Sequence, residues 1–212
     1  MKRFLIVDDH TIIREGVGRI LQGLLGQTIT LDEASCGQQA LDMAASCKYD
    51  LVLLDISLPD QNGLNVLKTL RQNCPAQPVI VFSTHPDEHY TVRSLRAGAA
   101  GYVNKGSDAS VLKEAIEKVL SGKRYVSSYQ SELLADALSE TAENQPIYQK
   151  LSDREYQMVC MMTAGKTLSE IAKELTISVK TVSTYRARVL EKLHLRTTAD
   201  IINYGIQQKL TL

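Results

Sequence analysis

Three aspartates in the first half of the chain each stand directly after a run of apolar residues. Asp8 and Asp9 follow FLIV, and Asp55 follows LVLL. Neighbouring carboxylates repel one another, and three of them cannot all stay ionised without a cation. Oxygen-only ligands favour a hard divalent ion, Mg2+ first. Beside such an ion, one carboxylate can act as a nucleophile toward phosphorus.

Two hydroxyl groups and one ammonium group occupy matching places after two further apolar runs. Ser83 and Thr84 follow VIVF, and Lys105 follows GYVN. Ser83 could donate a hydrogen bond to a phosphoryl oxygen, and Lys105 together with the metal ion could neutralise its charge. Taken one at a time, an aspartate at a strand end is usually a turn or capping residue, and a lysine there is usually solvated. Because all four apolar runs are followed by a residue suited to this chemistry, we favour the functional interpretation.

Five strands and five helices must position these side chains. We expect strands at 4–7, 29–34, 50–55, 78–83 and 101–105, and helices at 11–25, 37–47, 63–73, 87–98 and 108–121. Residues 51–54 and 79–82 are uniformly apolar, which is typical of strands buried on both faces of a parallel sheet. The alternation predicts a doubly wound α/β domain with a five-stranded parallel sheet, in which ligands bind at the carboxyl ends of the strands.

The motifs IVDDH, LLDISLPDQNG, VFS and GYVNK together resemble the receiver domain of bacterial two-component response regulators, which has a flavodoxin-like fold. The resemblance covers roughly residues 1–121 and implies that Asp55 is the phosphoacceptor. It also implies that Asp9, Asp55 and the backbone carbonyl of Ser57 hold Mg2+, with Asp8 close behind. Pro59 and Gly63 would let the loop after Asp55 turn tightly over the site.

The same resemblance assigns a switch to this site. Ser83 and Tyr102 match the switch pair, with Thr84 beside Ser83, and Lys105 matches the lysine that stabilises the phosphoryl group. Once Ser83 bonds a phosphoryl oxygen, its loop would move inward and the Tyr102 ring would turn in from the surface. Without the resemblance, Tyr102 would more often be a half-buried core aromatic.

The second half of the chain has a different pattern. Residues 122–146 read as a linker, within which 128–138 could be helical, and residues 147–212 predict four short helices and no strand. Capping boxes are expected at Ser152 and Thr167, and further caps at Ser178 and Thr197. Residues 147–212 hold ten Lys and Arg against six Asp and Glu, although the whole chain has no net charge. An acidic N-terminal part and a basic C-terminal part suggest two domains with different partners.

The stretch TLSEIAKELTISVKTVSTYRARVLEKL predicts a helix, a short turn and a second helix. At about 100° per residue, Val182, Val189 and Leu193 share one face of the second helix. The opposite face is polar, and such a face can approach base edges in a major groove while flanking arginines meet phosphates. The residues expected to contact DNA are Lys180, Thr181, Ser183, Thr184, Arg186, Ala187 and Arg188. An ordinary amphipathic helix with a solvated face has the same pattern.

The longer stretch LSDREYQMVCMMTAGKTLSEIAKELTISVKTVSTYRARVLEKL resembles the LuxR-type helix-turn-helix, over roughly residues 148–212. A receiver joined to this module is the arrangement of the NarL/FixJ family of transcription regulators. The resemblance implies that a sensor histidine kinase phosphorylates Asp55 and thereby switches sequence-specific binding to double-stranded promoter DNA. It also implies RNA polymerase as a partner and a homodimer when phosphorylated.

Other features narrow the class of protein. No apolar run approaches 18 residues, and the N-terminus MKRFLIVDDH has too short an apolar run for a signal peptide. The four cysteines show no metal-ligand spacing and read as reduced thiols. We therefore expect a cytoplasmic protein without a membrane partner. We also expect no enzymatic activity beyond self-catalysed phosphotransfer and dephosphorylation.

Two other interpretations stay open. A phosphatase with an aspartyl-phosphate intermediate also uses Asp, Ser or Thr, and Lys at strand ends. Such enzymes carry the nucleophile on the first strand with a second Asp two residues later, whereas here Asp55 is on the third strand and Ser57 stands at that position. A signalling adaptor would use the tail only to bind protein. Turnover of a phosphomonoester would favour the phosphatase, and salt-dependent DNA binding would exclude the adaptor.

Overall fold

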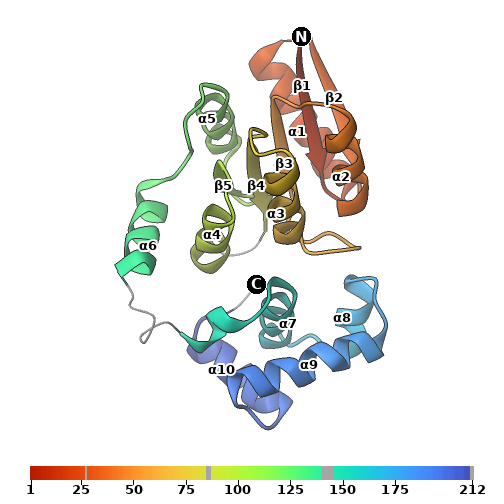
Figure 1. The fold of residues 1–212 in the computed structure, drawn as a ribbon, viewed down its shortest axis with the longest axis vertical. Helices are drawn as coiled ribbons and strands as arrows, with labels where there is room; N and C mark the ends of the chain where they lie inside the picture. The colour runs from red at the N-terminus through yellow and green to blue at the C-terminus, as the bar shows by residue number, and fades with distance from the viewer. Residues whose placement is uncertain (27, 85–86, 140–145, 211–212) are drawn as a thin grey trace. The chain divides into compact units, whose positions relative to one another are not determined.

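The computed structural model describes residues 1–26, 28–84, 87–139 and 146–210. Contacts among them divide the chain into two compact units, Met1–Leu134 and Ala135–Leu212. Figure 1 shows strands only in the first unit and helices in both. Within the described ranges, no helix is both long and apolar enough to cross a membrane.

The first unit is built on a five-stranded sheet in the order β2-β1-β3-β4-β5, and every neighbouring pair is parallel. The strands are β1 (Lys2–Val7), β2 (Ile29–Ala34), β3 (Leu51–Leu54), β4 (Val79–Ser83) and β5 (Gly101–Asn104). The helices that alternate with them are α1 (Thr11–Leu25), α2 (Gly37–Ser46), α3 (Gly63–Asn73), α4 (Asp87–Arg96) and α5 (Ala109–Leu120). This confirms the predicted doubly wound fold.

The central strands are buried on both faces, as their uniformly apolar sequences predict. All four residues of β3 are buried. One apolar core joins alternate strand residues such as Phe4, Leu53 and Ile80 to α1 and α5. On the other side α2 packs against α3, and α3 against α4 (Figure 1). The two helical layers leave the carboxyl ends of the strands as the place where polar side chains meet.

The segment after α5 stays attached to the first unit. Tyr125 pairs with Gly101 of β5 in a parallel bridge, and its N–H donates to the Ala100 carbonyl at 2.8 Å. The Tyr125 ring belongs to the core cluster beneath α5. The helix α6 (Ser128–Ser139) follows, close to the helix predicted at 128–138. Part of the expected linker therefore packs on the sheet.

The second unit has helices and no strand among its described residues. It contains the 3-10 helix η1 (Ile147–Lys150) and the helices α7 (Asp153–Thr163), α8 (Leu168–Glu174), α9 (Val179–Leu193) and α10 (Thr198–Gln207). Ser152, Thr167 and Thr197 each form a capping box, and the Ser178 side chain accepts from the N–H of Thr181. All four predicted caps are confirmed.

The core of the second unit forms between α7, α9 and α10. Val182, Val189 and Leu193 on α9 are buried, which confirms the predicted apolar face. Glu155 in the first turn of α7 pairs with Lys192 of α9 at 2.6 Å. On α10, Ile201 is fully buried whereas Ile206 is 58% exposed.

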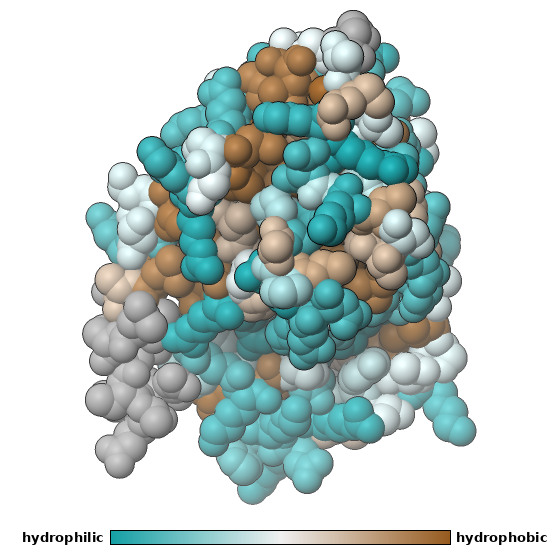
Figure 2. Space-filling view, turned by 45° about the horizontal axis from the view of Figure 1, so that its top comes forward, coloured by the Kyte–Doolittle hydropathy of each residue, from teal (hydrophilic) through white to brown (hydrophobic). Residues whose placement is uncertain are grey.

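Most of the visible surface in Figure 2 is hydrophilic, and apolar side chains appear as separate areas between polar ones. The large apolar residues exposed among the described ones are Met1, Ile12, Tyr129, Val179 and Ile206. They come from different elements, so the apolar surface they offer is scattered along the chain.

Candidate functional site

The polar residues predicted at the strand ends meet at one edge of the sheet. Asp8 follows β1 and Asp55 follows β3, and each is only 2% exposed. Lys105, directly after β5, lies between them. Its Nζ is 2.6 Å from Asp8 Oδ2 and 2.8 Å from Asp55 Oδ2. The structure therefore brings together two carboxylates and one ammonium group from three separate strands.

This contact keeps Lys105 charged. Burial by itself lowers the pKa of the Lys105 ammonium, but the negative charge of Asp55, its hydrogen bond and the same contributions from Asp8 outweigh burial and raise the pKa above its ordinary value. A charged ammonium at this position can also neutralise a phosphoryl oxygen that arrives at Asp55.

Ser83 and Thr84 lie at the neighbouring strand end. The N–H of Lys105 donates to the Ser83 carbonyl at 2.8 Å, which joins the ends of β4 and β5. Ser83 is fully buried and Thr84 is exposed. The serine is thus the hydroxyl residue that the backbone ties directly to Lys105.

Asp9 and His10 stand at the outer side of the same site. Asp9 keeps 37% of its side chain exposed, and its Oδ1 is 2.8 Å from His10 Nδ1. His10 Nδ1 is also 3.2 Å from Asp8 Oδ1, and ligand atoms of the three residues lie within 4.8 Å of one another. Asp8, Asp9 and Asp55 thus place three carboxylates around the single Lys105 ammonium. This excess of oxygen ligands fits a hard divalent cation. His10 was not predicted, although it directly follows the two aspartates.

The loop after Asp55 closes tightly at its base. The N–H of Ile56 donates to Asp55 Oδ1 at 2.7 Å, and the N–H of Gly63 donates to the Ile56 carbonyl at 2.8 Å. A Cβ on Gly63 would lie 2.0 Å from the Asp55 carbonyl oxygen, so only glycine fits there. Between these points Ser57 forms a bridge with Asn62. The predicted tight turn is present, and the close backbone approach explains its glycine.

Arg14 supports the turn that carries the two N-terminal aspartates. Its Nη1 donates to the Asp8 carbonyl at 2.7 Å, and its Nε donates to Glu33 at 2.6 Å. Arg14 was not predicted, because an arginine on a surface helix has no distinctive pattern.

Tyr102 lies inside the first unit. Its side chain is fully buried. The inward turn of the ring on phosphorylation stays a prediction. Its backbone carbonyl accepts a hydrogen bond from the Gln130 side chain of α6 at 3.1 Å. Gln130 is 5% exposed, and its amide oxygen also accepts from the N–H of Ser127. The strand that carries the predicted switch residue is thus bonded directly to the first turn of α6.

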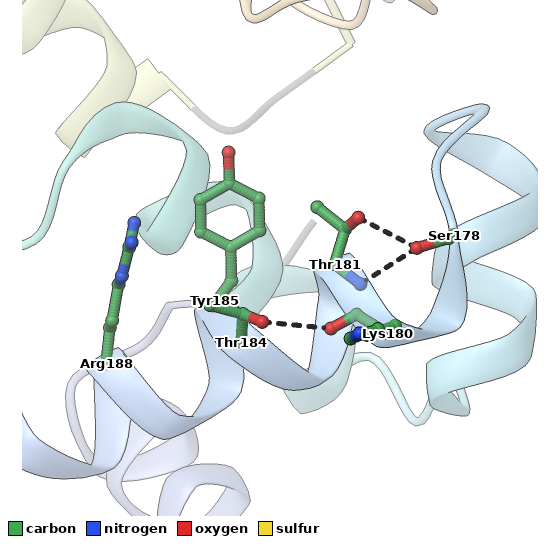
Figure 3. Close-up of a pocket in the computed structure, with 6 residues that line it drawn as sticks. All are labelled: Ser178, Lys180, Thr181, Thr184, Tyr185 and Arg188. Atoms are coloured by element: carbon green, nitrogen blue, oxygen red, sulfur yellow. Dashed lines mark hydrogen bonds between the residues drawn. The ribbon is translucent and has the colours of Figure 1, made fainter.

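The second candidate site is the exposed side of α9. An open recess of about 330 Å³ is lined by Ser178, Lys180, Thr181, Thr184, Tyr185 and Arg188. Figure 3 shows the Tyr185 and Arg188 side chains extending from the same side of the helix, and the Arg188 guanidinium lies 6.0 Å from the Tyr185 ring centroid. The Thr184 hydroxyl bonds back to the Lys180 carbonyl at 3.0 Å. Tyr185 and Ser178 were not among the predicted contacts.

The other predicted residues of α9 flank this recess. Ser183 is half-buried and Ala187 is exposed. Arg186 is turned toward α10, where its Nε donates to Thr198 Oγ1 at 2.7 Å. The cationic groups that line the recess are therefore those of Lys180 and Arg188.

Comparisons with known proteins match both halves of the chain. The family model described as "Response regulator receiver domain" matches residues 4–117, and the model described as "Bacterial regulatory proteins, luxR family" matches residues 149–204. Response regulator UvrY of Escherichia coli K12 is 32% identical over 210 residues, which cover 99% of this chain and 96% of that protein. Response regulator GacA of Pseudomonas aeruginosa is 32% identical over 201 residues, covering 95% of this chain and 94% of that protein.

A solved structure shares the fold. RcsB from Salmonella enterica serovar Typhimurium, bound to promoter rprA in the presence of phosphomimetic BeF3-, aligns with a TM-score of 0.63 and 20% sequence identity. The alignment covers 96% of this chain and 97% of that one.

Proposed function

Because this chain belongs to the NarL/FixJ family of two-component response regulators, with a receiver domain and a LuxR-type DNA-binding domain, we propose that a sensor histidine kinase phosphorylates it on Asp55. Phosphorylation then switches sequence-specific binding to promoter DNA and so controls transcription. The proposal places the receiver at 1–121, the linker at 122–146 and the DNA-binding domain at 147–212.

The observation that carries this proposal is the contact of one lysine with two buried carboxylates. An Asp55 oxygen attacks the phosphorus atom, the bond to the donor's leaving group breaks, and an acyl phosphate forms on Asp55. Lys105 Nζ, 2.8 Å from Asp55 Oδ2 and 2.6 Å from Asp8 Oδ2, is close enough to move to a phosphoryl oxygen while it stays beside Asp8. Ser83 donates a hydrogen bond to the same group.

Asp9, Asp55 and the Ser57 carbonyl, with Asp8 close behind, are proposed to hold Mg2+. The ion supplies positive charge that offsets the phosphoryl oxygens and the clustered carboxylates. Water that reaches the acyl phosphate would hydrolyse it, so the only chemistry we propose for the chain itself is self-catalysed phosphotransfer and dephosphorylation.

The switch is proposed to run through Ser83, Thr84 and Tyr102. A phosphoryl group adds charge and acceptor oxygens at Asp55, and Ser83 is the hydroxyl residue tied to Lys105 through the backbone. Tyr102 has the inward position that this movement would favour. Its backbone bond to Gln130 offers a path from β5 into α6.

DNA binding is proposed for α9. Lys180, Thr184 and Ala187 lie on its exposed side and would enter a major groove, with Thr181 and Ser183 at the edges. The exposed Arg188 would meet a phosphate beside them. Arg186 would contact a phosphate while its Nε keeps the hydrogen bond to Thr198.

A module of this size reads a short site, so two copies on a repeated half-site are expected, with the exposed Ile206 available for pairing. RNA polymerase and a cytoplasmic location belong to the same proposal.

The test is to treat the parent chain and Asp55→Asn with acetyl phosphate and Mg2+. A phosphate-affinity gel measures uptake, and a DNA shift assay with a selected duplex measures binding. The parent should take up about one phosphoryl group and bind DNA more tightly, while Asp55→Asn should do neither. Full, acid-stable labelling of the variant would show that another residue is the acceptor. Ser83→Ala should keep the uptake and lose most of the gain in DNA affinity.

A further inference from the structure

The tip of the loop after Asp55 is attached to α2 through a carboxylate that has no place in the chemistry above. Asp60 Oδ1 accepts a hydrogen bond from the N–H of Gly37 at 2.8 Å, and Oδ2 accepts one from the N–H of Gln38 at 2.8 Å. Gly37 and Gln38 form the start of α2. Asp60 therefore caps this helix from 23 residues further along the chain.

The helix has no cap of its own. Cys36 occupies the N-cap position and makes no side-chain hydrogen bond to the first turn. The first N–H groups of a helix need acceptors, and a negative charge there also interacts favourably with the helix dipole. Burial raises the pKa of Asp60, but the hydrogen bonds from Gly37 and Gln38 outweigh burial and lower that pKa. The carboxylate is thus charged and fixed where α2 needs it.

The loop and the helix also fit closely in shape. A Cβ on Gly37 would lie 2.6 Å from Val66 Cγ2 and 2.7 Å from Gln61 Cγ. No side chain fits between them, so the start of α2 rests directly on the loop and on α3. The hydrogen bonds of the Asp60 carboxylate add to this close packing, which leaves little room for the loop to shift.

The other end of this loop is fixed at the acceptor. Gly63 is bonded to Ile56 and touches the Asp55 carbonyl, and the bridge between Ser57 and Asn62 closes the loop in between. The loop thus has one anchor beside Asp55 and one at Asp60. The Ser57 carbonyl, which is the proposed metal ligand, lies between these two anchors, and metal ligands are oriented by the groups that surround them.

We propose that Asp60 is a positioning residue for the phosphorylation site: by holding the loop tip on α2, it keeps the Ser57 carbonyl and the Asp55 carboxylate placed for Mg2+. This rests on the proposed function. Loss of Asp60 would let the loop move and weaken Mg2+ binding, while the nucleophile itself stays intact. The defect in phosphorylation would therefore disappear once Mg2+ is saturating.

The experiment compares the full-length parent with Asp60→Ala, Asp60→Asn and the control Asp42→Ala. Asp42 is a carboxylate on the surface of α2 that accepts from the Gln38 side chain at 2.9 Å, so it matches Asp60 in charge but not in position. Isothermal titration calorimetry gives the Mg2+ dissociation constant. The rate of phosphorylation by acetyl phosphate is then measured across Mg2+ concentrations, and circular dichroism checks that each variant folds.

Asp60→Ala should raise the Mg2+ dissociation constant by about tenfold, the lower end for residues that orient metal ligands. Its phosphorylation should be slow at low Mg2+ and normal at saturating Mg2+. Asp60→Asn keeps one acceptor oxygen, so its Mg2+ dissociation constant should lie between those of the parent and Asp60→Ala. Asp42→Ala should have the dissociation constant of the parent. A purely structural role would leave a slow rate that Mg2+ does not restore.

The proposal is overturned if Asp60→Ala has the Mg2+ dissociation constant of the parent. Should that variant fail to fold, an unchanged constant for Asp60→Asn overturns it instead. The outcome is separable from the proposed function. If the parent takes up no phosphoryl group at Asp55, the proposed function fails, and the Mg2+ titration, which needs no phosphodonor, still decides the role of Asp60.

Discussion

Lys105 is the cation that lets Asp8 and Asp55 lie buried close together. Both carboxylates contact its Nζ, and all three side chains are less than a tenth exposed. Removing one partner of a buried ion pair typically costs about 3–5 kcal/mol because a charge is left uncompensated. We predict that Lys105→Met melts several degrees below the parent in EDTA, and that Mg2+ raises its melting temperature more than that of the parent.

Differential scanning calorimetry with and without Mg2+ measures this effect. Lys113→Met, which removes an exposed lysine from α5, is the matched control and should melt like the parent. Equal stabilisation of the parent and Lys105→Met by Mg2+ would mean that the lysine and the metal do not offset the same charges.

The Glu155 carboxylate should make the stability of the second unit depend on pH. Burial raises the pKa of this carboxyl, but the hydrogen bonds from Lys192 and Ser152 outweigh burial and lower the pKa below its ordinary value. A lowered folded-state pKa adds stability above the unfolded value, about 4.3, and this stability is lost as the pH falls through the folded value.

We therefore predict that Glu155→Gln lowers the free energy of unfolding by about 1–2 kcal/mol at pH 7 and that the difference from the parent shrinks below pH 5. Glutamine can still complete the capping box, so the change isolates the charge. Amide hydrogen exchange of α7 at pH 7 and pH 4 measures the effect, with Glu191→Gln on the exposed side of α9 as control. A difference that grows as the pH falls would contradict this prediction.

Residue types at strand ends could be predicted, whereas their supporting contacts could not. Asp8, Asp55 and Lys105 follow apolar runs, and parallel strands bring such positions to one edge. The bonds of Asp60 to α2 and of Arg14 to Glu33 join residues 23 and 19 positions apart. No local pattern marks a pair of that kind, because its members are chosen by how loops and helices pack.

The exposed side of α9 can be tested directly as a DNA-binding surface. Arg188→Ala should weaken DNA binding and reduce the slope of log K against log salt by about 1, because one phosphate contact is lost. Lys180→Ala should act in the same direction. Lys209→Ala, an exposed lysine beyond α10, should leave the slope unchanged. A filter-binding series over several salt concentrations measures the slope, and identical slopes for all variants would remove this side of α9 from the interface.

Gln130 links two elements through one amide group. Its nitrogen donates to the Tyr102 carbonyl, and its oxygen accepts from the N–H of Ser127 at the start of α6. We predict that Gln130→Leu takes up phosphate at Asp55 normally but gains less than half of the parent's increase in DNA affinity on phosphorylation, because β5 no longer holds α6.

Glu132→Ala is the control for this change, since Glu132 is exposed on the same helix. Phosphate uptake and DNA affinity are measured for each variant with and without acetyl phosphate. A full response by Gln130→Leu would show that the signal bypasses this bond.

Local signals gave the elements of the second unit with good accuracy. Each predicted cap has its partner three residues away, so the sequence contains the whole interaction. Tyr185 was missed for the opposite reason. Its helical position is at the margin of the polar face, and only the placement of its side chain beside Arg188 shows that it lines the recess.

For the whole molecule, alternation of apolar runs with helical patterns was enough to predict two domains and their classes. The family models match residues 4–117 and 149–204, on either side of the expected linker. What the sequence did not reveal is how far the first unit extends. Its contacts continue to Leu134, because Tyr125 enters the core and Gln130 is buried.

The pairing of Tyr125 with Gly101 predicts an effect on solubility. β5 is the last strand of the sheet, and an outermost strand with free N–H and C=O groups is a template for pairing with another chain. Tyr125, which follows α5, pairs with this strand at Gly101, and its ring is part of the hydrophobic core. A fragment of residues 1–121 should therefore self-associate and aggregate at concentrations where a fragment of residues 1–134 is monodisperse by light scattering. The start of the linker would thus protect the edge of β5 from pairing with a strand of another molecule.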